Sequence, residues 1–139
     1  MRTMQPGRQI YIGNINTSET EIKDLAKAWI AISIAFALVL RHDIGLAFYQ
    51  VLLISSITVG MGFLLHELGH KFVAQRYGCF AEFRSFDRML LLAVIMSFFG
   101  FVFAAPGAVM IAGKVDTRKN GIISVAGPVV NLILAVAFL

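Results

Sequence analysis

Residues 66–70 read His-Glu-Leu-Gly-His and match the zinc-binding pattern His-Glu-x-x-His. On a helix, positions four residues apart lie one turn above the other on the same face, so the imidazoles of His66 and His70 can bind one Zn²⁺. Glu67 points in a neighbouring direction and can take a proton from a water on the metal without being a ligand. Such a site suits the hydrolysis of a peptide bond.

The composition predicts a polytopic membrane protein in a lipid bilayer. Hydrophobic residues make up 58% of the chain and charged residues 14%, with a mean hydropathy of +0.80. A soluble domain carries about 25% charged residues. The net charge of +4 does not indicate a nucleic-acid partner, because the basic residues lie at the ends of apolar runs rather than in a stripe interleaved with aromatic residues. The lone cysteine, Cys79, excludes an internal disulfide and a cysteine-rich zinc site.

The chain divides into a polar N-terminal tail, residues 1–17, and a membrane-embedded core, residues 18–139. A capping-box pattern at residues 18–21 predicts the start of a helix that continues through Leu25–Leu40, and this helix is long enough to cross a bilayer. A second apolar run, Ile44–Leu65, is also of spanning length and passes directly into the histidine motif. The motif is therefore expected in the last turns of a transmembrane helix. Ionisable groups at that depth are costly and usually functional.

The next two segments are harder to place. Residues 79–88 alternate in part between apolar and polar side chains, which predicts a short strand at the membrane surface. The run Met89–Ala112 is long enough to span but is interrupted by glycine and proline. If it re-enters, eleven of the 12 basic residues share the N-terminal side; if it spans, the division is eight against four. The positive-inside rule favours the first arrangement, with a cytoplasmic N-terminus.

A last apolar helix is expected from near Gly121 to Leu139, where it stops without a polar cap, as though the core were incomplete at its C-terminus. The expected fold is thus an all-α, multi-pass membrane protein. It has about three transmembrane helices and a re-entrant or membrane-embedded segment with possible short strands.

Three stretches resemble the site-2 protease family of intramembrane zinc metalloproteases, particularly its archaeal members. They are the histidine motif, Ala126–Asn131 (AGPVVN) and Ala104–Val109 (AAPGAV). The resemblance implies zinc-dependent cleavage of a transmembrane segment in a membrane-protein substrate. It also implies that Asn131 positions the substrate or stabilises the reacting carbonyl, and that the segment around Pro106 and Gly107 helps to bind extended substrate.

The sequence departs from this family in one respect. Catalytic zinc usually takes three protein ligands, and the family's third ligand is an Asp in an Asp-Gly pair, which this chain lacks. Asp87 and Asp116 flank apolar runs and are expected to be solvated charges. The chain is therefore a truncated piece, is completed by a helix from elsewhere, or is inactive.

A non-cleaving membrane module and a zinc protease whose motif faces a cytosolic chamber are the competing hypotheses. The substrate's identity and the oligomeric state stay open.

Overall fold

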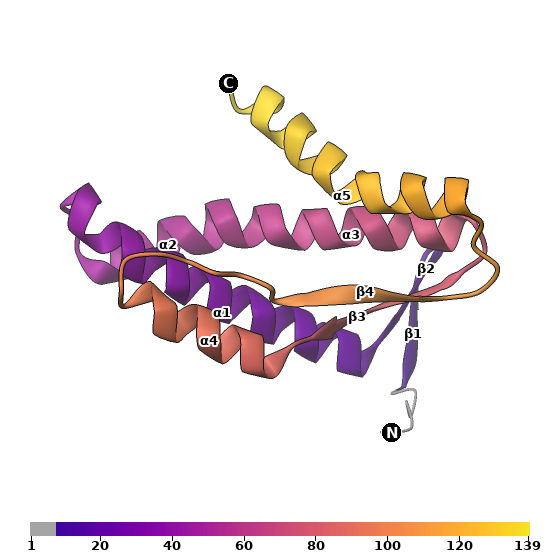
Figure 1. The fold of residues 1–139 in the computed structure, drawn as a ribbon, viewed down its shortest axis with the longest axis horizontal. Coiled ribbons are helices and arrows are strands. Elements are labelled where there is room, and N and C mark those ends of the chain that lie inside the picture. The colour runs from indigo at the N-terminus through magenta and orange to yellow at the C-terminus, as the bar shows by residue number, and fades with distance from the viewer. Residues whose placement is uncertain (1–7) are drawn as a thin grey trace.

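A computed structural model describes residues 8–139, which form helices and two small antiparallel sheets. Helices α3 and α5 pack against each other on one side, while α1 and α4 run together on the other (Figure 1). The elements in chain order are β1 (Gln9–Ile12), β2 (Ile15–Ser18), α1 (Glu19–Ile44), α2 (Phe48–Ser55), the π-helical turn η1 (Ser56–Gly60), α3 (Met61–Arg76), β3 (Phe80–Ser85), α4 (Asp87–Ser97), β4 (Gly107–Ala112) and α5 (Thr117–Ala137).

The expectation of an all-α protein with about three transmembrane helices is wrong. The fold is mixed, with 66% of the described residues in helices and 15% in strands. Within residues 8–139, two helices are long and apolar enough to cross a membrane: Phe48–Arg76, which runs through α2, η1 and α3, and Thr117–Ala137. Two physical causes explain the difference. The first turns of α1 are rich in charged residues that bond inside the protein, and part of the apolar run after residue 89 pairs as a strand.

The predicted helix start at Ser18 is confirmed. The Ser18 hydroxyl accepts a hydrogen bond from the backbone N–H of Glu21 at 3.2 Å, which satisfies one of the donors left free at a helix N-terminus. The Glu21 side chain points away from the cap and into the protein. Its carboxylate is fully buried.

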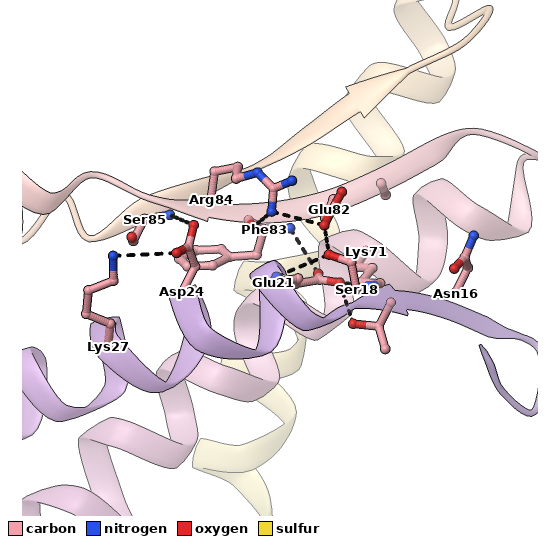
Figure 2. Close-up of polar contacts among 12 residues, drawn as sticks. Asn16, Ser18, Glu21, Asp24, Lys27, Lys71, Glu82, Phe83, Arg84 and Ser85 are labelled. Carbon is pink, nitrogen blue, oxygen red and sulfur yellow. Dashed lines mark hydrogen bonds and ion pairs between the residues drawn. The ribbon is translucent and has the colours of Figure 1, made fainter. Parts of the chain in front are cut away.

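Glu21 is the centre of a buried polar network that joins four elements (Figure 2). Its carboxylate forms an ion pair with Lys71 of α3. It also accepts hydrogen bonds from the Phe83 backbone N–H of β3 at 2.9 Å and from the Thr17 hydroxyl of β2 at 2.6 Å. Because a buried charge is tolerated only when it is paired and hydrogen-bonded, these partners fix α1 against α3 and β3.

Two further contacts hold α1 against the end of β3 and the start of α4, and Figure 2 shows the one between Asp24 and Ser85. Asp24 accepts a hydrogen bond from the Ser85 backbone N–H at 3.1 Å, and the Lys27 ammonium lies 2.8 Å from the Asp87 carboxylate. Both partners belong to the end of β3 or the start of α4. The charged turns of α1 are therefore used within the protein.

The helix that carries the histidine motif contains a π-helical turn, Ser56–Gly60, before α3 begins. A π turn leaves part of the helical hydrogen-bond ladder unmatched. Here the Ser56 carbonyl accepts a hydrogen bond from the indole N–H of Trp29 at 3.0 Å. Gly60 lies against the same indole, where an added Cβ would overlap the ring. Helix α3 ends at Arg76, and Gly78 follows with φ of +75°. The expected placement of the motif near the end of an apolar helix is confirmed.

The run Met89–Ala112 folds back on itself. Helix α4 leads away from β3, and β4 returns to pair with β3 in an antiparallel register that runs from Phe80↔Ala112 to Ser85↔Gly107. The two ends of the excursion meet where the Phe86 N–H donates to the Pro106 carbonyl at 2.9 Å. The strand predicted within residues 79–88 is confirmed.

Part of the polar N-terminal tail forms a hairpin of β1 and β2. Gly13, in the turn, has φ of +60°, a conformation that glycine adopts without steric cost. The Gln75 side chain of α3 bonds both backbone groups of Asn16, at 3.1 Å to the N–H and 2.7 Å to the carbonyl. The hairpin is thereby attached to the helix that carries the motif. The remainder of the tail, residues 1–7, lies outside the described residues.

Candidate metal centre

Helices α3 and α5 pack in close contact, and small residues make this possible. A Cβ on Gly69 of α3 would lie 2.8 Å from the Val130 side chain and 3.2 Å from the Ala126 carbonyl oxygen of α5. The absence of a side chain at Gly69 lets the two helix backbones approach. Helix α5 contains Pro128, and its second half bends away from α3 (Figure 1).

The two histidines of the motif point to a common position. Their Nε2 atoms are 3.1 Å apart, and the ring planes stand at 82° with centroids 4.8 Å apart. Both side chains are half-buried. The spacing of four residues on α3 therefore brings two nitrogen donors together in the way that a shared ion requires.

Helix α5 contacts the other nitrogen of each ring. The Nδ1–H of His70 donates to the Ile123 backbone carbonyl at 2.7 Å, and the Nδ1 of His66 lies 3.0 Å from the Nδ2 of Asn131. Partners of this kind orient metal-binding histidines in known sites. Sequence reasoning named Asn131 but missed Ile123, because a backbone carbonyl leaves no mark in the residue type. The available signal was the spacing of 123, 127 and 131, which places them on one helix face.

Gly127 provides the test of whether a metal fits. A Cβ added there would lie 2.6 Å from the His66 Nε2 and closer still to the His70 Nε2. The volume that a side chain would fill is therefore the volume toward which both nitrogens point. Since Zn–N bonds are about 2.0–2.1 Å long, an ion held by both rings fits beside a glycine and not beside a larger residue.

The donor set within residues 8–139 has two members. No group of three or more His, Cys, Asp or Glu residues in that range is placed to hold a metal ion. Asp116 caps α5 by accepting the Lys119 N–H at 2.7 Å, and Asp87 pairs with Lys27. Neither aspartate lies at the histidine pair, and the two rings fit two of the three protein ligands of a catalytic zinc.

Glu67 and His70 line a cleft of about 340 Å³. Its lining comes from α3, β4 and the first turns of α5: Glu67, His70, Gly107, Ala108, Val109, Ile111, Asn120, Ile123 and Ser124. The structure therefore brings Gly107 to the same cleft as Glu67. Pro106 precedes it and anchors the return of the chain through its carbonyl. A Cβ at Gly107 would meet the Phe83 ring and the Arg84 carbonyl, so only glycine fits there without rearrangement.

Comparison with known proteins finds a relative that is named as a zinc metalloprotease. Over 123 residues the chain is 41% identical to "Putative zinc metalloprotease MJ0611" of Methanocaldococcus jannaschii. The match covers 87% of this chain and 61% of that relative, so the chain spans less than two thirds of the relative's length. No protein-family model matches the chain. No solved structure matches it either.

Proposed function

We propose that this chain forms part of an intramembrane zinc metalloprotease of the site-2 type, which cleaves peptide bonds within transmembrane segments of other proteins. The observation that carries the proposal is the pair of Nε2 atoms 3.1 Å apart, facing the side-chain-free surface of Gly127. The pair lies on an apolar helix long enough to cross a bilayer. The zinc metalloprotease relative supports the reaction class.

The proposal places the protein in the cell membrane as a multi-pass protein with a cytoplasmic N-terminus. The fold-back of residues 89–112 supports this orientation. The end of β4 pairs with the start of β3, so Lys114, Arg118 and Lys119 return to the side of the membrane on which β3 begins. Apart from Arg41, the basic residues within 8–139 then gather on one side, as the positive-inside rule requires of the cytoplasmic face. The lipid bilayer is the expected surrounding of α5 and of the helix that carries the motif.

In this proposal His66 and His70 hold the ion, and Glu67 handles the proton. Zinc, when bound, supplies the Lewis acidity that makes water nucleophilic at neutral pH. The Glu67 carboxylate accepts a proton as the water attacks the peptide carbonyl, and then donates it to the departing amine nitrogen. Its place in the cleft beside His70 puts it on the substrate side of the histidines.

The substrate segment is proposed to bind in extended form along β4. Within residues 8–139, β4 pairs with β3 on one edge, and the cleft that contains Glu67 is lined by four β4 residues, Gly107, Ala108, Val109 and Ile111. An extended peptide can add to a free strand edge through backbone hydrogen bonds. Unwinding of a transmembrane helix into this geometry would present its peptide bonds to the site. Pro106 and Gly107 set where the strand begins.

A second candidate function is a membrane module that binds zinc but cleaves nothing. The observation that favours it is the donor set of two histidines among residues 8–139. A site that needs a third protein ligand for hydrolysis is incomplete with these two alone. The two functions differ in proteolysis and agree in metal binding.

One experiment tests both candidates. The full chain is reconstituted with zinc in lipid vesicles that contain a transmembrane peptide, the metal is measured by atomic absorption, and peptide products are measured by mass spectrometry. The variant His66→Ala is compared with His42→Ala, which removes an imidazole at the exposed end of α1. We expect zinc in the wild type and in His42→Ala, and little in His66→Ala. Equal zinc in both variants would refute the site, whereas zinc without peptide products would decide for the non-cleaving module.

A further inference from the structure

The cleft that contains Glu67 has a floor and two walls. Helix α3 packs against α5, also contacts β4, and lies between them (Figure 1). It supplies Glu67 and His70 to the cleft, while β4 and the first turns of α5 supply the facing walls. Both walls run along the long axis of the molecule (Figure 1). A segment bound over α3 therefore has β4 on one side and α5 on the other.

The β4 wall of the cleft is a strand edge. Successive residues of a strand face opposite sides of the sheet, yet the consecutive residues Gly107, Ala108 and Val109 all line the cleft. A cavity that contacts both sets of residues lies along the edge of the strand rather than over one face. Strand β3 pairs with β4 on the other edge. The cleft therefore lies where an added strand would hydrogen-bond with β4.

The α5 wall of the cleft has two polar side chains. Asn120 and Ser124 line the cleft from the first two turns of α5, and both residues are exposed. Within residues 8–139, neither side chain makes a hydrogen bond. The other residue of this wall, Ile123, is apolar, and its side chain is buried. Asn120 and Ser124 are therefore the polar side chains that the cleft offers opposite β4.

An extended segment in this cleft needs hydrogen-bond partners on both of its edges. The backbone groups of successive residues in a strand point alternately to the two edges, so β4 can bond only half of them. The other half face α5, and a backbone group left unpaired in apolar surroundings costs free energy comparable to a lost hydrogen bond. The Asn120 carboxamide has a donor and an acceptor, and the Ser124 hydroxyl can act as either.

The spacing of Asn120 and Ser124 matches the repeat of a strand edge. Four residues of an α-helix rise by about 6 Å, and alternate residues of a strand, which share an edge, are about 6.6–6.8 Å apart. The two side chains can therefore contact neighbouring residues of that edge. A contact of this kind already exists in the chain, where the Gln75 carboxamide of α3 bonds both backbone groups of Asn16 in β2, at 3.1 Å to the N–H and 2.7 Å to the carbonyl.

We propose that Asn120 and Ser124 bind the backbone edge of the substrate segment that faces away from β4, so that the extended segment is held between β4 and α5 over Glu67. The inference rests on the proposed function, since it takes this cleft as the substrate site. Because the contacts are to backbone groups, they select a segment that can unwind and present free N–H groups, whatever side chains it carries. A proline opposite Asn120, which has no N–H, is disfavoured.

A backbone scan of a substrate peptide tests the proposal. A fluorescent transmembrane peptide is mixed with the full, zinc-loaded chain in detergent micelles, and its N–H groups are replaced one at a time by ester oxygens. Anisotropy read before products form gives the affinity, and mass spectrometry of the same samples gives cleavage. In the wild type we expect losses of roughly 3–10-fold, the usual net value of a hydrogen bond, at alternate positions that face β4 and at two positions between them.

The variants assign the two intermediate positions. Asn120→Leu, which keeps a similar volume, should abolish the ester effect at one of them and leave the positions that face β4 unchanged. Ser124→Ala should abolish it at the other, two residues away along the peptide. Asn14→Leu, in the exposed β1–β2 turn, is the matched control and should keep the wild-type pattern.

The outcomes separate this proposal from the proposed function. A wild-type pattern in Asn120→Leu would overturn the role of Asn120, and cleavage in the same samples would leave the protease standing. A wild type that binds no peptide, or that tolerates every ester between the positions facing β4, would also overturn the proposal. Binding that depends on Asn120 in samples without products would support it and refute the proposed protease.

Discussion

Lys71 follows His70 directly, and its ammonium group forms an ion pair with Glu21 in which the two side chains are 3% and 1% exposed. The helix that carries the candidate metal ligands is thus joined by charge to the first turn of α1. Since Glu21 also accepts the Phe83 N–H, the same carboxylate positions the sheet that lines the cleft. Stability and site geometry therefore depend on one buried group.

Removing one partner of this ion pair should be costly. We expect Lys71→Met to lower the free energy of unfolding by about 3–5 kcal/mol, because it leaves a buried carboxylate without its counterion. Adding Glu21→Gln should recover much of the loss, since the amide still accepts from Phe83 and carries no charge. Unfolding in mixed micelles with increasing denaturing detergent measures both variants. Lys23→Met, which breaks the exposed pair with Glu19, is the control and should cost less than about 1 kcal/mol.

Gly127→Ala should abolish metal binding while the helix persists. The added Cβ occupies the volume toward which both Nε2 atoms point, so zinc and the methyl group compete for one place. Gly121→Ala is the matched control, because it lies on the same helix with nothing within 4 Å of its added Cβ. Isothermal titration of each purified protein with zinc gives the affinities. Zinc affinity in Gly127→Ala equal to that of the control would place the ion elsewhere.

Glu67→Gln should separate metal binding from catalysis. We expect this variant to keep the zinc content of the wild type and to lose about 10²–10⁴-fold in cleavage rate, because an amide cannot accept the proton of the attacking water. The rate is measured on the vesicle-embedded peptide in a preparation that cleaves. Glu19→Gln, at the exposed start of α1, should change neither quantity. Cleavage retained in Glu67→Gln would exclude Glu67 as the base.

Gly60→Ala should destabilise the π-helical turn. Its Cβ would be forced into the Trp29 indole, and overpacking of this kind costs about 1–3 kcal/mol. Gly62→Ala, two residues further along the same helix, meets open space and should be neutral or stabilising by up to about 1 kcal/mol. Trp29 is the only tryptophan, so its fluorescence follows the change directly. Equal unfolding midpoints for the two variants would show that the indole moves aside without cost.

The sequence predicted the parts of the fold that local patterns determine. The capping residue Ser18, the helical setting of the histidines and the strand near residue 80 all follow from periodicity and helix-end signals. The pairing of β4 with β3 could not be predicted, because β4 lies within an apolar run whose composition suits a helix equally well. Its strand structure comes from pairing with β3, a long-range contact.

The two candidate metal ligands could be predicted from the sequence, whereas the groups of α5 that contact them could not. His66 and His70 follow from spacing alone, whereas the role of Gly127 depends on how closely α5 approaches α3. The Ile123 carbonyl has no signature in residue type, and the burial of Glu21 and Lys71 contradicts the usual exposure of charged residues. These features arise from tertiary packing.

The meeting of Phe86 and Pro106 has a consequence for how the molecule can vary. Because the chain leaves and re-enters the β3–β4 sheet at one shared hydrogen bond, α4 and the loop at residues 98–105 form a closed excursion from the sheet. Insertions or deletions in that loop would change how far the excursion extends without altering the strand register that brings Gly107 to the cleft. Loop length and site alignment are thus separable, and each can be redesigned while the other is held constant.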